Sequence, residues 1–219
     1  MINKSNDIVI VAALRTPIGA YKGSLKGFSA DKLGTAVIKE ALNETKLNPE
    51  DIDEVIMGQV LTSGAGQNPA RQAAVNAGIP VSKAAHIVNQ VCGSGLRSIV
   101  SGYQSIKSGD NKIVVAGGQE SMSKAPHSIF YRDDKKLSPD KLIDTMIHDG
   151  LIDAFNNYHM GITAENVAEK YKISRNEQDI FALNSQKKTQ DAIGKKKFKD
   201  EIIKLQIKNN KENVIFDND

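Results

Sequence analysis

The chain has 219 residues, of which 40% are hydrophobic and 25% charged, values typical of an ordinary soluble globular protein rather than a disordered one. Its net charge of +3 is too small and too scattered to favour nucleic acid as a partner. No apolar run approaches the roughly 20 residues that span a bilayer, and the polar start lacks the apolar core of a secretion signal. The single cysteine excludes an internal disulfide, so we expect a cytoplasmic protein with no membrane partner.

The first half of the chain alternates between strand and helix patterns. We predict a buried strand at residues 8–13, a helix from Ser29 to about Thr45 and a strand at residues 55–60. Asn68 and Pro69 suit the N-cap and the first position of a helix that ends near residue 77. Strands that alternate with helices favour an α/β fold with a mostly parallel sheet.

The only cysteine, Cys92, lies where a predicted buried strand, residues 84–88, turns into a helix. Gly93, Ser94 and Gly95 follow it, and then an apolar face at helical spacing, formed by Leu96, Ile99, Val100, Tyr103 and Ile106. The positive end of a helix favours a thiolate, and its free N–H groups can stabilise an oxyanion. From this stretch alone, Cys92 is either a nucleophile or a small buried hydrophobic residue.

The pattern changes after a fourth predicted strand, residues 113–116. We place a boundary near residues 118–122, which divides the chain into residues 1–118 and residues 119–219. The second part reads as helices at about 141–147, 162–171 and 175–193, and the last begins with a capping box at Ser174 and Glu177.

Two groups of polar residues allow both a binding and a structural interpretation. Arg71 and Gln72 could contact a ligand, although structural or subunit contacts are favoured. Residues 187–211 contain nine lysines, which could steer a polyanion but are more typical of a solvated helix face followed by an exposed connection. Only Phe198 places an aromatic ring among these lysines, which argues against a nucleic-acid site.

Five ordered motifs resemble the thiolases, enzymes that condense or cleave acyl-CoA thioesters, and are closest to the acetoacetyl-CoA type. They are RTPIG at residues 15–19, GQNPARQA at 66–73, NQVCGSGLRS at 89–98, AGGQESMS at 116–123 and YHMGITAEN at 158–166. The resemblance implies a layered αβα N-terminal half with a mixed, mostly parallel sheet. It also implies that residues 119–219 begin a mainly helical loop domain that covers the active site and binds CoA.

The same resemblance assigns roles to individual residues. Cys92 would be the nucleophile that takes the acetyl group, while Leu151, His159 and Met160 would line the CoA and acyl end of the pocket. Without the resemblance, a histidine beside a methionine more often serves packing or the surface. The implied substrates are acetyl-CoA and acetoacetyl-CoA, with no prosthetic group and no metal, and the implied assembly is a homo-oligomer, either a dimer or a tetramer. A single cysteine could not in any case supply a thiolate cluster for a metal.

In thiolases a histidine in GHP, an asparagine in NEAF and a second cysteine in CxGxG complete the site, and these motifs do not occur in the 219 residues. Two alternatives therefore stand beside a thiolase. One is a non-catalytic fragment or split subunit that needs a partner carrying the C-terminal half. The other is a ketoacyl-synthase-like condensing enzyme, which shares the architecture and a nucleophilic cysteine. We also expect an unpaired sheet edge and a large exposed apolar patch.

Overall fold

A parallel three-stranded sheet is the centre of the structure, a computed structural model that describes residues 7–132, 142–209 and 212–219. Its strand order is β2 (Ala84–Val88), β1 (Glu54–Gly58) and β3 (Val114–Gly118), so β1 is central. Glu54 lies opposite Ala84 on one side and Val114 on the other, and the pairing continues to Gly58. The predicted α/β class with a mostly parallel sheet is confirmed.

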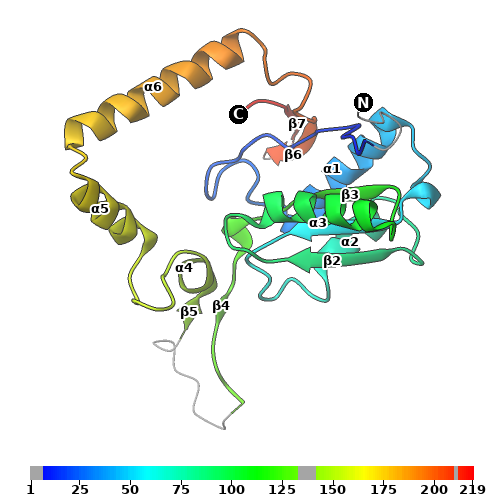
Figure 1. The fold of residues 1–219 in the computed structure, drawn as a ribbon, viewed down its shortest axis with the longest axis horizontal. Coiled ribbons are helices and arrows are strands. Elements are labelled where there is room, and N and C mark those ends of the chain that lie inside the picture. Colours follow the sequence, from blue (N-terminus) through cyan, green and yellow to red (C-terminus); the bar gives the residue numbers. More distant parts are fainter. Residues whose placement is uncertain (1–6, 133–141, 210–211) are drawn as a thin grey trace.

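Helices cover both faces of this sheet (Figure 1). The helices α1 (Ala30–Thr45) and α2 (Pro69–Asn76) pack on one face, where alternate β1 residues Val55 and Met57 join the main core. The helix α3 (Ser94–Ser108) packs on the other face, against β1 and β3. The main core contains Ile38, Leu42, Ile52, Val55, Met57, Ala70, Ala73, Ala74, Ala77 and Ile79.

Local chemistry explains where α2 begins and how it is held. The Asn68 side chain accepts a hydrogen bond from the Arg71 N–H at 3.1 Å, and Pro69 occupies the first helical position, as predicted. The Arg71 guanidinium donates to the carbonyls of Val81 and Lys83 at 2.6 and 3.0 Å. These contacts are of the structural kind that the sequence favoured for Arg71.

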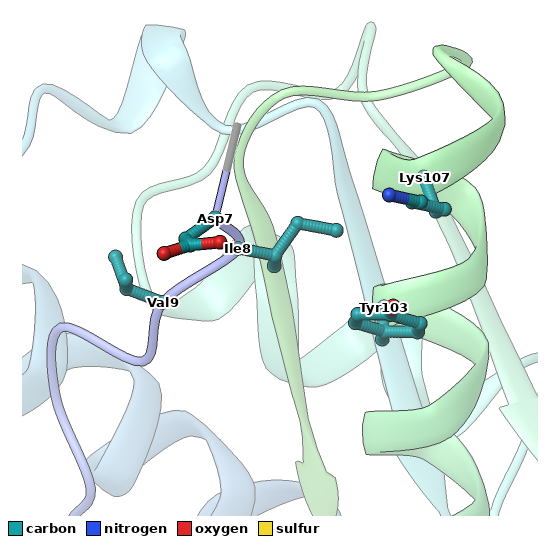
Figure 2. Close-up of a pocket in the computed structure, with 5 residues that line it drawn as sticks. All are labelled: Asp7, Ile8, Val9, Tyr103 and Lys107. Atoms are coloured by element: carbon teal, nitrogen blue, oxygen red, sulfur yellow. The ribbon is translucent and has the colours of Figure 1, made fainter. Parts of the chain in front are cut away.

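The strand predicted at residues 8–13 is wrong. These residues form no strand, and the side chains of Val9, Ile10 and Val11 are exposed. A strand needs a neighbour to satisfy its backbone, and within the described ranges none pairs with this segment. A cavity of about 400 Å³ separates the segment from α3, with Ile8 pointing toward the helix (Figure 2).

The expectation that residues 84–88 form a buried strand also fails. The strand β2 is half exposed because it is the edge of the sheet and pairs only with β1. The face of α3 that packs on the sheet consists of the small residues Ser94, Ser98 and Gly102, while the apolar face around Leu96 is exposed. Small side chains allow the helix backbone to approach the sheet closely. The helix therefore packs on the sheet through these small residues and not through its larger apolar face.

The second part of the chain is mainly helical, with two short antiparallel strand pairs. The helix predicted at 141–147 begins only at Thr145, because Ile143 and Asp144 pair with β4 and the Asp144 carboxylate caps the helix; residue 141 lies outside the described residues. The capping box of Ser174 and Glu177 is confirmed. The elements are η3 (Met122–Lys124), β4 (His127–Ser128), β5 (Ile143–Asp144), α4 (Thr145–Gly150), α5 (Met160–Tyr171), α6 (Arg175–Gly194), β6 (Leu205–Asn209) and β7 (Glu212–Phe216), while η2 (Pro49–Asp51) precedes β1.

The helices α5 and α6 extend away from the sheet, whereas the hairpin of β6 and β7 returns to lie beside α1 (Figure 1). The exposed connection predicted here is therefore wrong for part of its length, because Ile203 and Leu205 are buried in a second core with Leu25. Arg15 donates to the Glu201 and Asp219 carboxylates at 2.6 and 2.8 Å, which joins the segment before α1 to the residues on either side of this hairpin. The division at residues 118 and 119 stays a prediction.

Candidate functional site

Three contacts fix the N-terminus of α3 on the carboxyl ends of β1 and β3. Gly58 ends β1 so close to α3 that a Cβ there would lie 2.3 Å from the Ser94 carbonyl carbon. A Cβ at Gly118, the end of β3, would lie 3.2 Å from the Gly95 Cα. The buried Ser98 hydroxyl lies 2.6 Å from the Gly117 carbonyl oxygen and donates to it. Cys92, two residues before the first residue of α3, is therefore held where the parallel strands end.

The turn that carries Cys92 is strained and braced. Val91 has φ +47°, a left-handed conformation that is costly for a β-branched residue. The Ser94 hydroxyl, which is buried, accepts from the Gln90 N–H at 2.9 Å and donates to the Val91 carbonyl. The N–H groups of Gly93 and Ser94 close the same turn by donating to the Gln90 and Val91 carbonyls. These bonds hold the backbone in a shape that it would not adopt alone.

Cys92 opens into a cavity of about 450 Å³. Its side chain is exposed, so the interpretation of Cys92 as a buried hydrophobic residue is wrong. The cavity combines apolar walls with a polar end at the strand termini. It is lined by Gly58, Gln59, Val60, Leu61, Val91, Cys92, Ser94, Gly95, Gly118, Gln119, Glu120, Met122, Gly150 and Leu151.

The polar end of the cavity is a network of buried side chains. Gln59 and Gln119, only 1% and 5% exposed, directly follow β1 and β3. The Gln119 amide donates to the Gln59 side-chain oxygen at 2.8 Å, and Gln59 donates to the Leu61 carbonyl at 2.8 Å. Because a buried polar group must be hydrogen-bonded to be tolerated, these bonds fix the loop after β1 to the end of β3.

Glu120 adds a carboxylate to this network. It accepts hydrogen bonds from the N–H groups of Val60 and Leu61 at 2.8 and 3.2 Å. Burial raises the pKa of the Glu120 carboxyl above its usual value, and the two N–H donors offset this only in part. The carboxylate is thus a partly desolvated group whose two oxygens are both engaged by backbone.

The residues predicted to bind CoA are only partly brought together. Leu151 lines the cavity with Cys92, whereas His159 and Met160 are not among its lining residues. His159 caps α5, with its Nδ1 accepting from the Gly161 N–H at 3.0 Å. The Met160 N–H donates to the Leu151 carbonyl at 2.8 Å, so the two positions are directly coupled through the backbone.

The sequence prediction missed Gln59, Gln119, Glu120 and Met122. The available signal was their position, since each follows the end of a strand in a parallel sheet, the side on which ligands bind. Within the described ranges, no group of three or more His, Cys, Asp or Glu side chains could hold a metal ion. None of the helices found in those ranges is both long and apolar enough to cross a membrane.

Comparison with known proteins identifies the family to which this architecture belongs. A model of the thiolase N-terminal domain matches residues 8–219. The chain belongs to the thiolase family. The implied αβα fold is supported by a solved thiolase, the Bacillus anthracis acetyl-CoA acetyltransferase, which superposes with a TM-score of 0.91 at 36% identity. That comparison covers 98% of this chain and 55% of the other.

Curated relatives of this thiolase-family chain include two bacterial proteins. The acetyl-CoA acetyltransferase of Pseudomonas aeruginosa is 54% identical over 215 residues, which are 97% of this chain and 55% of the relative. The probable acetyl-CoA acetyltransferase of Escherichia coli is 50% identical over 214 residues, which are 97% of this chain and 54% of the relative. The chain thus spans about half the length of the relatives it matches.

Proposed function

We propose that this chain carries the nucleophile of a thiolase-type acetyl-CoA acetyltransferase, and that Cys92 takes the acetyl group as a thioester. The observation that carries the proposal is the placement of an exposed thiol in a cavity at the carboxyl ends of β1 and β3, two residues before α3. The relatives named acetyl-CoA acetyltransferases point to the same substrate. The cavity is apolar over much of its lining, which suits an acyl group.

In the proposed first step, the Cys92 sulfur attacks the carbonyl carbon of acetyl-CoA. A new sulfur–carbon bond forms, the bond between that carbon and the CoA sulfur breaks, and the CoA thiolate leaves and takes up a proton. Thioester exchange of this kind needs no metal or redox cofactor because both thioesters have similar energy. A second acetyl-CoA, deprotonated at its methyl group, would then attack the acetyl-cysteine and release acetoacetyl-CoA.

The Cys92 backbone N–H is the donor that we assign to the oxyanion of this step. The N–H groups of the next two residues, Gly93 and Ser94, already donate within the turn to the Gln90 and Val91 carbonyls at 3.0 Å. Because these bonds occupy the neighbouring donors, the Cys92 N–H is the better placed of the three to act as an oxyanion donor.

The CoA portion of the substrate would lie over the second part of the chain. In this proposal residues 119–219 form the start of a loop domain, and Leu151, His159 and Met160 line the path of the pantetheine arm and the acyl group. The second step would use the acid–base groups of the GHP, NEAF and CxGxG motifs, supplied by a C-terminal half. A homo-oligomer, either a dimer or a tetramer, remains the expected assembly.

Intact mass spectrometry after incubation with acetyl-CoA tests the proposal. Cys92 should gain about 42 Da, an acetyl group in place of a proton. The Cys92→Ser variant should gain nothing under the same conditions. An unmodified wild-type chain that is folded by circular dichroism would contradict the proposal and favour the non-catalytic fragment.

A further inference from the structure

The loop after β1 forms one wall of the Cys92 cavity, and the N–H groups of that wall are bonded to one carboxylate that follows β3. Val60 and Leu61 belong to this wall, and both of their N–H groups donate to Glu120, at 2.8 and 3.2 Å. Glu120 comes two residues after the end of β3. The Glu120 side chain, which follows β3, therefore fixes the backbone that follows β1.

The wall reaches the opposite side of the cavity as well. A Cβ added to Gly150, at the end of α4, would lie 3.5 Å from the Leu61 side chain, so the end of α4 lies close to the wall. Gly150 and Leu151 line the same cavity as Cys92. A shift of Leu61 would thus change the width of the cavity that Leu61 lines together with the predicted CoA-binding residue Leu151.

Only an ionised carboxylate fits this arrangement fully. Each Glu120 oxygen accepts from a different N–H, so both must be acceptors. A glutamine of the same shape would turn its NH₂ group toward one of the two backbone N–H donors and lose that bond. The neighbouring Gln59 side chain is already bonded to Gln119 and to the Leu61 carbonyl.

We propose that Glu120 is a positioning residue, whose carboxylate holds the Val60–Leu61 wall at the distance from Cys92 that an acyl-CoA thioester requires. The inference rests on the proposed acetylation of Cys92. Glu120 acts through the wall and does not itself take part in bond making. Its loss should therefore slow acylation by acetyl-CoA while leaving the chemical reactivity of the exposed thiol unchanged.

The experiment compares the wild-type chain with Glu120→Gln and with Glu44→Gln, the same change at an exposed position of α1. Three quantities are measured: hydrogen exchange of a peptide that contains Val60 and Leu61, the rate of Cys92 acetylation by acetyl-CoA, and the rate of its alkylation by iodoacetamide. For Glu120→Gln we expect exchange about 10- to 100-fold faster and acetylation about 10-fold slower, with alkylation unchanged. Glu44→Gln should match the wild type in all three.

Each other result overturns the proposal. Unchanged exchange would show that Glu120 does not hold the wall, and parallel losses of acetylation and alkylation would show a general disturbance. Unchanged acetylation despite faster hydrogen exchange would show that Glu120 holds the wall but has no effect on acylation. If the wild-type chain takes no acetyl group, both the proposed function and the positioning role fail. This result is recognised in the wild type alone, whereas the previous three are recognised in the Glu120→Gln variant. If Glu120→Gln does not fold, the same measurements are made on Glu120→Asp. The aspartate side chain is too short to reach both N–H groups.

Discussion

At the scale of single residues, the turn that presents Cys92 depends on one hydroxyl. The Ser94 side chain is 4% exposed and serves both as acceptor for the Gln90 N–H and as donor to the Val91 carbonyl. It therefore holds Val91 in its left-handed conformation. Strain of this kind persists only where surrounding bonds enforce it, which makes Ser94 the residue on which the position of the sulfur depends.

Ser94→Ala should destabilise the chain by about 1 to 3 kcal/mol, because the Gln90 N–H is left without its partner. Acetylation of Cys92 should slow as well, since Val91 is free to leave the strained conformation. Urea unfolding and the mass-spectrometric acetylation rate measure the two effects. Ser101→Ala, on the same helix but outside the turn, is the control, and an equal loss in both variants would contradict the specific role of Ser94.

At the scale of elements, close backbone approach decides which positions must be glycine. In α1, a Cβ at Gly34 would lie 2.0 Å from the Gln119 side-chain oxygen, which is buried and held through its amide by Gln59. Replacing a helical glycine by alanine ordinarily stabilises a protein by about 0.5 to 1 kcal/mol. Here the sign should reverse, because Gln119 cannot move without losing its bond in the cavity network.

We predict that Gly34→Ala destabilises the chain by about 1 to 3 kcal/mol, the usual cost of overpacking. Gly194→Ala is the matched control, since a Cβ at that helical position meets nothing within 4 Å. Urea unfolding should show a lower midpoint for the first variant and a slightly higher one for the second, since nothing opposes the ordinary gain from alanine there. A higher midpoint for Gly34→Ala would mean that Gln119 repacks without cost.

The contact between β1 and α3 leads to a stronger prediction. A Cβ at Gly58 would lie 2.3 Å from the Ser94 carbonyl carbon and 2.5 Å from the Gly95 nitrogen, both rigid backbone atoms. Gly58→Ala must therefore push the start of α3 away from the sheet. We expect a loss of about 3 kcal/mol in unfolding free energy and slower acetylation of Cys92. Wild-type stability in urea would refute this account of how the helix is docked.

The success of prediction at this scale depended on whether the deciding interaction was local. The start of α2 at Asn68 and Pro69 was predictable because a cap and a proline act within one turn. The strand at residues 8–13 was not, because apolar residues form a strand only where a pairing neighbour exists. The position of the thiol just ahead of α3 was predictable from its own flanking residues, but the position of Glu120 beside it was not, because it depends on β3 lying beside β1.

At the scale of the whole molecule, the start and the end of the chain are joined by one ion-pair cluster. Both Asp219 side-chain oxygens accept from the Arg15 guanidinium at 2.8 Å, and Asp219 also accepts from the Ile18 N–H at 2.9 Å. The hydrogen bonds from Arg15 lower the pKa of the Asp219 carboxyl below its ordinary 3.8. Because the folded-state pKa is the lower one, the cluster stabilises the fold above the unfolded-state pKa and loses this effect as pH falls further.

Asp219→Asn should accordingly cost stability at pH 7 but not in strong acid. Solvent screening limits the difference from wild type to about 1 kcal/mol at pH 7, and it should vanish as pH falls below 3.8 through the folded-state pKa. Urea unfolding at a series of pH values measures it. Asp217→Asn is the control, as its carboxylate accepts from Asn218 rather than from Arg15. A difference that grows toward low pH would contradict the assigned sign.

An exposed apolar surface combines the N-terminal segment with α3. Val9 and Tyr103 line one cavity (Figure 2), and Leu96, on the same helix, is 70% exposed. Contiguous apolar surface of this kind drives association in water. We therefore expect the chain to self-associate with increasing concentration in sedimentation velocity.

The variant Leu96→Glu distinguishes association through the α3 surface from nonspecific association through any exposed apolar side chain. The charge should weaken association, and because Leu96 is largely exposed and lies in the first turn of α3, a carboxylate there should not harm the helix. Phe155→Glu removes an apolar side chain that is 97% exposed in the loop before α5 and should leave association unchanged. Equal effects of the two variants would assign association to apolar exposure anywhere, and a wild-type monomer at every concentration would show that the α3 surface does not drive it at all.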